Sequence, residues 1–181
     1  PASWAYQAAV EQAVMDAVMA SDGSTMALFT SHASLRTTAT GIRSNLQAHG
    51  INVLAQGVDG PPNRLVQSFV KDSKSVLLGT ASFWEGVDLP GDILKVLLLA
   101  RLPFSVPTAP VFAARAEEFD EPFTEYAIPQ AILRVRQGFG RLIRTKTDRG
   151  AVIILDRRII SRNYGKIFLD SLPDTTFKTF K

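Results

Sequence analysis

The spacing of apolar residues along the chain predicts alternating helices and strands. Valines recur at every fourth position within residues 4–20, which predicts an amphipathic helix there. A second helical pattern runs through Ile42 and Leu46 and ends at Gly50, and a third covers residues 63–71. Short apolar runs between the helical segments predict strands. These cover residues 26–30, 51–56, 75–80, 95–100 and 151–155, with a candidate edge strand at 175–180.

Strands that alternate with helices favour parallel βαβ units and a doubly wound sheet, which is an α/β fold. Ligands bind such sheets beyond the carboxyl ends of the strands. We therefore expect the loops that follow four of the strands to lie on one side of the sheet. These loops are residues 30–32, 79–88, 101–104 and 156–158.

A cationic helix is predicted in the last third of the chain. Its polar positions are spaced i, i+3, i+7 and i+10, so they share one face of a helix. They are Arg134, Gln137, Arg141 and Arg144. The helix also contains Gly138 and Gly140, each of which costs about 0.5–1 kcal/mol relative to alanine. We expect close backbone approach there, and two guanidinium groups beside an amide suit an anion such as a triphosphate.

Composition places the chain among globular domains, and the uneven distribution of charge indicates the kind of partner it binds. The 181 residues are 46% apolar and 20% charged, which fits one domain. Residues 134–166 carry a net charge of +8, whereas the rest of the chain carries −5. This asymmetry indicates a surface that faces a nucleotide or a nucleic acid, although a solvated basic surface would look the same.

Other features of the composition limit where the chain acts. It has no cysteine, which excludes disulfides and thiolate metal sites and fits a cytoplasmic protein. No apolar run approaches the length of about 20 residues that a membrane span needs, and residues 1–4 do not resemble a signal peptide. A proline-rich stretch opens a partly helical insert at about 103–129, whose acidic residues we expect to face solvent.

The chain lacks the phosphate-binding half of a nucleotide hydrolase. It contains no G-x-x-x-x-G-K-[ST] loop, and no strand ends in adjacent acids that could hold Mg²⁺. His32 and His49 are isolated, so we expect no metal site.

The loop at 79–88 leaves two interpretations open. Asp88 could accept from ribose hydroxyls or cap a turn, and Phe83 with Trp84 could pack in the core or stack on bases.

Several segments resemble one group of helicases. Residues 79–88 read GTASFWEGVD and are similar to helicase motif V. Residues 137–144 read QGFGRLIR and resemble motif VI, the Q-x-x-G-R-x-x-R box of superfamily 2 helicases. The particular residues in these two segments resemble those of the DinG branch of the DinG/XPD group of DNA helicases. Residues 28–32 resemble motif IV, and residues 101–104 resemble the segment between motifs V and VI. The matches run in order over residues 28–156.

This resemblance implies the second RecA-like lobe of a two-lobe motor, covering residues 1–181 as one domain. The implied fold is a three-layer α/β sandwich of the P-loop NTPase type, with a mostly parallel sheet and helices on both faces. ATP and Mg²⁺ would be held mainly by the first lobe of the same protein. Any iron–sulfur cluster, which is typical of the group, would also lie in that lobe. The partner would be single-stranded DNA.

The resemblance also assigns roles to individual residues. Arg141 and Arg144 would reach the γ-phosphate of ATP, and Gln137 would position that phosphate or the attacking water. The motif V residues expected at the nucleotide are Glu85, Gly86 and Asp88, of which Asp88 could instead pair with a motif VI arginine. The residues expected to hold the DNA backbone are Thr30, Ser31 and Thr80.

Two other classes of function remain open from the sequence. A RecA-like module that grips single-stranded nucleic acid without ATPase activity would show the same basic region. A Rossmann-type enzyme is disfavoured, because no G-x-G-x-x-G follows any predicted strand.

Overall fold

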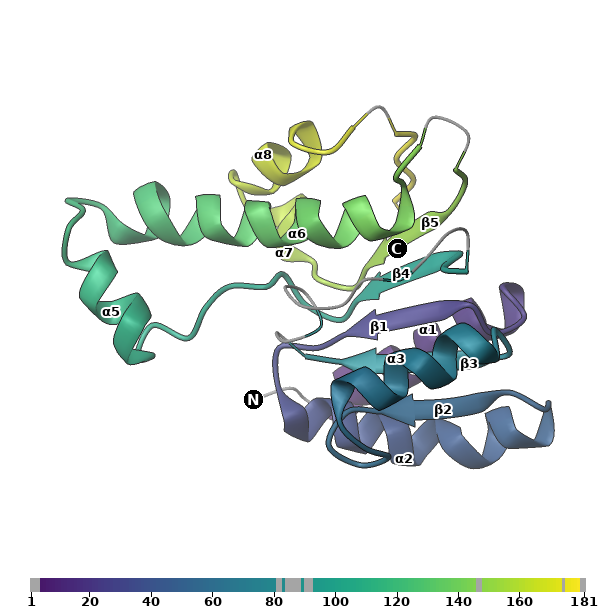
Figure 1. Ribbon diagram of the computed structural model, residues 1–181. Coiled ribbons are helices and arrows are strands. Elements are labelled where there is room, and N and C mark those ends of the chain that lie inside the picture. Colours follow the sequence, from purple (N-terminus) through teal and green to yellow (C-terminus); the bar gives the residue numbers. More distant parts are fainter. Residues whose placement is uncertain are drawn as a thin grey trace.

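The computed structural model describes residues 4–80, 83, 89, 93–145, 148–173 and 175–179. Within these ranges it contains one five-stranded parallel sheet, with the strand order β2-β3-β1-β4-β5 (Figure 1). All five strands predicted from apolar runs are present, and their ends lie within two residues of the predicted ones. The strands are β1 (Thr25–Leu28), β2 (Asn52–Ala55), β3 (Ser75–Gly79), β4 (Val96–Leu99) and β5 (Ala151–Ile154).

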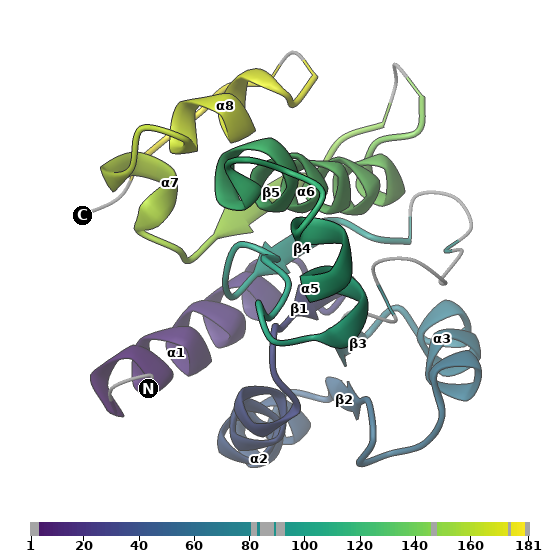
Figure 2. The same ribbon diagram turned by 90° about the vertical axis from the view of Figure 1, so that its left-hand side faces the viewer.

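Helices cover both faces of the sheet, so the expected three-layer architecture is confirmed. Helices α1 (Trp4–Ala20) and α2 (His32–Ala48) pack on one face. Helices α3 (Pro62–Lys71) and α6 (Ile128–Leu142) pack on the other (Figure 2).

Alternate strand residues supply the two cores because successive side chains point to opposite faces. Ala27, Val76 and Leu98 face α1 and α2, whereas Leu77 and Leu97 face α3 and α6. Each fully buried leucine contributes about 1.5–3 kcal/mol. Strands buried on both faces read as continuous apolar runs, which is why these runs predicted them well.

The connection from β4 to β5 contains an arm that projects beyond the sheet (Figure 1). It includes α5 (Pro110–Ala116) and a π-helical turn, η1 (Phe123–Ala127), within the expected insert. Pro129 explains the wide turn, because proline has no N–H and its ring clashes with the carbonyl four residues earlier. The Ile128 N–H instead donates to the Phe123 carbonyl, five residues back. The acidic side chains of the arm are exposed, as expected.

The chain continues after β5 through two short helices, α7 (Arg158–Ser161) and α8 (Gly165–Asp170). Phe168 of α8 is fully buried in the core beside α6. No helix in the described ranges combines the length and apolar character needed to cross a bilayer.

The edge strand expected at 175–180 is wrong for the residues that the structure describes there. Residues 175–179 form no regular secondary structure and all of their side chains are exposed. Phe177 is the one apolar residue among these five. A strand is held in register by a buried face, and this stretch has too little apolar surface to bury one.

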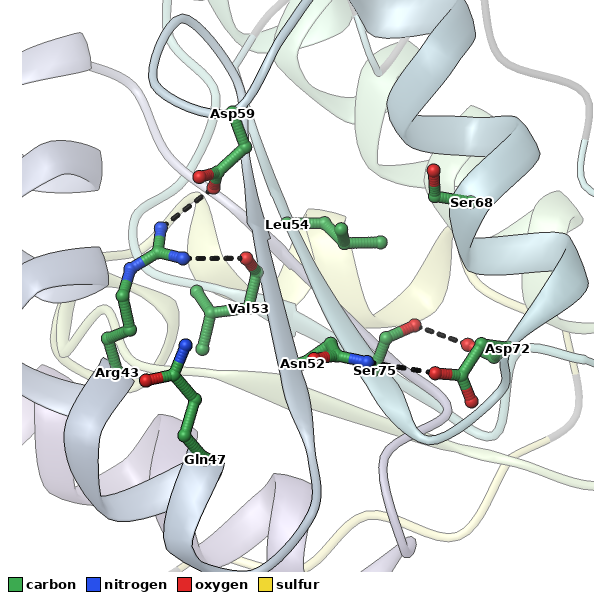
Figure 3. Close-up of a pocket in the computed structure, with 9 residues that line it drawn as sticks. All are labelled: Arg43, Gln47, Asn52, Val53, Leu54, Asp59, Ser68, Asp72 and Ser75. Atoms are coloured by element: carbon green, nitrogen blue, oxygen red, sulfur yellow. Dashed lines mark hydrogen bonds and ion pairs between the residues drawn. The ribbon is translucent and has the colours of Figure 1, made fainter.

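The outer edge of β2 is closed by an ion pair (Figure 3). Arg43 donates to the Val53 carbonyl at 3.1 Å and to the Asp59 carboxylate at 2.7 Å. Asp59 in turn accepts from the Ala55 N–H at 2.8 Å. These contacts occupy backbone groups that an edge strand would otherwise present to another chain.

A hollow of about 310 Å³ lies beside this edge, between α2 and α3. Its polar groups largely bond one another. Asn52 donates to the Asp72 carboxylate at 2.9 Å, and the Ser75 hydroxyl donates to the Asp72 carbonyl at 2.6 Å. We therefore interpret the hollow as part of the protected sheet edge and not as the functional site.

Candidate functional site

The C-terminal half of α6 presents an open polar face. Gln137 and Gly140 are exposed, and Arg141 is half-buried one turn after Gln137. A Cβ atom built on Gly140 would meet nothing within 4 Å, so the backbone here is uncovered. No residue in the described ranges makes the close backbone approach that we expected at this glycine. Gly138, by contrast, is buried.

Arg144 does not lie on the helix, so the predicted four-residue helical face is wrong at its last position. Helix α6 ends at Leu142, and Ile143 adopts an extended conformation with φ −121° and ψ 104°. The Asp148 carboxylate accepts hydrogen bonds from the Arg144 N–H at 2.8 Å and the Thr145 N–H at 2.9 Å. A carboxylate from beyond the helix therefore fixes the backbone that carries Arg144.

The hydrogen bonds to Asp148 also affect its ionisation. The hydrogen bond from the Thr145 hydroxyl, followed by those from the Arg144 and Thr145 backbones, lowers the pKa of Asp148 below its ordinary value. Asp148 is thus charged at neutral pH, and its carboxylate accepts the hydrogen bonds from the two backbone N–H groups. In the sequence, Asp148 entered only the net charge of residues 134–166.

Arg134 is engaged in a structural role. Its guanidinium donates to the Pro103 carbonyl at 3.0 Å and to the Ser105 hydroxyl at 2.7 Å. These contacts tie α6 to the segment that follows β4. Arg134 was predicted to bind an anion with the other residues of its helix face, but its side chain instead bonds the segment after β4.

The loops at the carboxyl ends of the strands lie together, as the topology predicted. The Thr80 hydroxyl after β3 lies 3.4 Å from His32 Nε2 after β1. The Asp156 carboxylate after β5 accepts from the Leu102 N–H after β4 at 3.0 Å. Since β1 and β4 are neighbours, these contacts place the first described residues after all four strands on one edge of the sheet.

The three residues expected to hold a nucleic-acid backbone differ in exposure. Thr30 and Ser31 are exposed, and Ser31 caps α2 by accepting from the Ser34 N–H at 3.2 Å. Thr80 is only 7% exposed. Its N–H and its hydroxyl both donate to the Gln56 side chain, at 2.8 and 3.0 Å. The structure thus leaves Thr30 and Ser31 accessible and occupies the donors of Thr80.

Glu85, Gly86 and Asp88, expected at the nucleotide, lie outside the described residues, as does Trp84. Phe83 is fully buried, which confirms its core interpretation. A Cβ on Gly79 would lie 2.6 Å from the Phe83 ring, so glycine is required at the end of β3.

Phe83 and Leu89 belong to the same hydrophobic cluster as Val135 and Leu142 of α6. Two residues of the segment between β3 and β4 therefore share a core with α6.

The two candidate regions lie at opposite ends of the sheet. Helix α6 leads from the carboxyl end of β4 to the amino end of the parallel strand β5, so its last turn lies at the opposite end of the sheet from the segment that follows β1 (Figure 1). At 1.5 Å per residue, the 15 residues of α6 span about 22 Å.

In the described ranges, no group of three or more His, Asp or Glu side chains could hold a metal ion.

Comparison with known proteins identifies close relatives of the sequence. DinG of Bacillus subtilis, named as a 3'-5' exonuclease, is 45% identical over 156 residues, covering 83% of this chain and 17% of the relative. The ATP-dependent DNA helicase YoaA of Haemophilus influenzae is 40% identical over 167 residues, covering 90% of this chain and 26% of the relative. The chain thus spans about a quarter or less of the length of these relatives.

Solved structures show the same fold. An XPD helicase structure matches 90% of this chain and 30% of its own, with a TM-score of 0.69 and 17% identity. A structure of apo XPD gives a TM-score of 0.67 over 88% of this chain and 33% of its own, at 18% identity. At this identity the likeness concerns the fold. The family model described as the helicase C-terminal domain matches residues 14–175. The chain therefore belongs to the helicase C-terminal domain family, with DinG and YoaA among its relatives.

Proposed function

We propose that this chain is the C-terminal motor lobe of an ATP-dependent DNA helicase of the DinG type. The observation that carries the proposal is the end of α6, where Gln137 and Gly140 are exposed beside half-buried Arg141, in a chain without a phosphate-binding loop. Such a face fits half of a composite site. The other half, with ATP and Mg²⁺, would belong to the first RecA-like lobe of the same protein.

In this proposal Arg141 and Arg144 stabilise the charge on the transferring phosphoryl group. Arginines supplied across an interface in this way are worth about 10³–10⁵ in rate, or roughly 4–7 kcal/mol. Gln137 orients the phosphate or the attacking water. Because these groups come from a separate lobe, hydrolysis depends on closure of the cleft between the lobes.

The same proposal assigns the carboxyl edge of the sheet to single-stranded DNA. Thr30 and Ser31 offer exposed hydroxyls to phosphodiester oxygens. Thr80 belongs to the same proposed group, and its contact with the strand requires rearrangement of Gln56, to which its N–H and hydroxyl donate. Glu85, Gly86 and Asp88 remain the proposed motif V contacts to the nucleotide.

A single segment connects the two regions. The chain between β3 and β4 starts beside Thr80 at the carboxyl edge and returns at the amino end of β4, and its residues Phe83 and Leu89 pack on the core beside α6. It therefore offers a physical route by which nucleotide state could alter the grip on DNA. This arrangement suits a translocating motor.

The experiment that tests the proposal compares the full-length parent protein with this 181-residue chain. We expect ATP hydrolysis by the parent, stimulated by single-stranded DNA, and no hydrolysis by the chain alone. A parent protein without DNA-stimulated hydrolysis would contradict the motor assignment.

The net charge of +8 in residues 134–166 supports a second candidate, a single-stranded nucleic-acid-binding module without ATPase activity. That candidate predicts tight DNA binding by the isolated chain, with an affinity that falls steeply with salt. The motor proposal predicts weak binding until the first lobe is present.

The Gly140→Ala substitution separates stability from function. Gly140 is exposed on a helix and has open space around its Cβ position, so alanine should fit and stabilise the chain by about 0.5 kcal/mol. We expect a slightly higher melting temperature of the chain, together with at least a tenfold loss (roughly 1.4 kcal/mol) of ATPase kcat in the parent. Gly140→Ser should cost more activity than alanine. Full ATPase activity in both variants would show that nothing approaches this backbone.

A further inference from the structure

A cavity of about 180 Å³ lies between the carboxyl ends of β1 and β4. These strands are neighbours, but the chain leaves them in opposite directions. After β1 it enters α2 on one face of the sheet, and after β4 it leads to α6 on the other. Parallel sheets bind ligands in the crevice that forms where adjacent connections diverge in this way. The cavity is therefore placed where this fold class holds a ligand.

The lining of the cavity suits an anion. Arg101 contributes a guanidinium, and Thr30, Ser31 and Ser34 contribute hydroxyls, with no carboxylate among the lining residues that the structure describes. The Ser34 hydroxyl donates to Gln7 at 3.1 Å. The Ser31 oxygen accepts from a backbone N–H, so its own hydrogen can still be donated.

Arg101 differs from two other partly buried arginines that lie beside the sheet. Arg43 and Arg158 each form an ion pair with an aspartate, at 2.7 and 2.6 Å. Across the described ranges, no ion pair involves Arg101. Its charge is therefore not neutralised by a carboxylate of the described chain.

The position of Arg101 is built by its surroundings. Its guanidinium lies 4.7 Å from the ring centroid of Tyr6, on α1. The Tyr6 hydroxyl donates to the carbonyl of Ala100, immediately before Arg101. The Asp156 carboxylate accepts from the N–H of Leu102, immediately after it. The side chain is thus stacked and the backbone is fixed on both sides.

We propose that Arg101 is a phosphate ligand for the single-stranded nucleic acid, acting with the hydroxyls of Thr30 and Ser31, and that Tyr6 positions it. This inference rests on the proposed function and adds the cation that the predicted grip of hydroxyl residues lacked. The phosphate belongs to the strand and not to the nucleotide, because the proposed nucleotide face lies at the other end of α6.

The first test replaces Arg101 with glutamine in the full-length protein. We expect the affinity for an oligothymidylate, measured by fluorescence anisotropy, to fall about tenfold. Because one phosphate contact is lost, the slope of log K against log salt should become shallower by about 0.7. The KM for ATP should stay within twofold of wild type. Arg115→Gln removes an exposed arginine on the arm and should change neither the affinity nor the slope.

The second test concerns the positioning role of Tyr6. Tyr6→Leu removes the ring under Arg101 and should weaken DNA binding about fivefold, whereas Tyr6→Phe keeps the ring and should lose less than twofold. In an Arg101→Gln background, Tyr6→Leu should have almost no further effect, since its role is to place that guanidinium. A purely structural tyrosine would instead weaken binding equally in both backgrounds.

Three results would overturn the inference. Unchanged DNA affinity in Arg101→Gln would show that the side chain does not meet the strand. A weaker affinity with an unchanged salt slope would mean that the loss is structural. A raised KM for ATP with normal DNA binding would assign the phosphate to the nucleotide. None of these would remove the DNA-stimulated ATPase of the wild-type parent, so the proposed function would stand or fall separately.

Discussion

Replacing Arg141 or Arg144 with alanine in the full-length parent should lower the kcat of DNA-stimulated ATP hydrolysis by about 10³-fold, or roughly 4 kcal/mol. The apparent affinity for DNA should change less than threefold, because the proposed strand-binding edge lies at the other end of the sheet. Steady-state ATPase assays with saturating single-stranded DNA would measure the loss.

The local structure explains why both positions should matter. Arg141 lies in the last turn of α6 and is half-buried, so its reach is limited by the helix. Arg144 is exposed and lies on an extended segment held by Asp148. The two guanidinium groups therefore start from different elements. They could meet a phosphoryl group from two directions, which a single helix face would not allow.

Two further variants make the test sharper. Arg136→Ala removes an exposed arginine from the same helix, 5 positions before Arg141 and so on a different face, and should retain nearly full activity. Arg144→Lys keeps the charge but loses the planar fork, so most of the activity should still be lost. If Arg144→Ala remained within threefold of wild type, its proposed role as an arginine finger would be wrong.

The sequence predicted the sheet well because buried parallel strands carry their signal locally. Apolar runs such as Val96–Leu99 fill both cores, and the turn residues around them limit their length. Topology then predicted that the loops after β1, β3, β4 and β5 would gather at one edge. The edge strand predicted at 175–180 was wrong because this local signal was incomplete. Threonines that alternate with Phe177 resemble a strand, but the segment has too few apolar residues to bury a face.

The site was less predictable because it depends on contacts between distant segments. Helical periodicity placed Arg134 and Arg144 on one face with Arg141, but Arg134 binds Pro103 and Ser105 and the helix stops before Arg144. Nothing near Arg101 in the sequence indicates Tyr6, which is 95 positions away on α1. Asp148 accepts from Arg144 and Thr145, which precede it, whereas the local turn rule for aspartate concerns backbone groups that follow it, so this contact was not predicted either.

Replacing Asp156 with alanine should be the most destabilising of these changes, at about 3 kcal/mol. Asp156 is 8% exposed and accepts from Arg158 at 2.6 Å and from the Leu102 N–H at 3.0 Å. Alanine would leave a buried backbone N–H unpaired and the guanidinium without its carboxylate. In urea denaturation of the chain, the midpoint should fall by roughly 1–1.5 M.

The ionisation of Asp156 gives this prediction a pH dependence. Burial raises the pKa of its carboxyl, but the hydrogen bonds from Arg158 and Leu102 outweigh burial and hold the pKa below its ordinary value. A group with a lowered folded pKa stabilises the fold fully above its unfolded pKa of about 3.9, and the contribution disappears as the pH falls through the folded pKa. The stability gap between wild type and Asp156→Asn should thus be constant near neutral pH and shrink below about pH 4.

Comparison with Arg158→Ala distinguishes the two halves of this interaction. Arg158 is 40% exposed, so its ion pair is partly screened by solvent, whereas the Leu102 N–H is not. We therefore expect Arg158→Ala to cost about half as much as Asp156→Ala. If the two variants were equally stable, the ion pair would dominate. If Asp156→Ala cost less than about 1 kcal/mol, the Leu102 contact would not hold the β4 and β5 ends together. In that case the fixed backbone on which Arg101 depends would need another source.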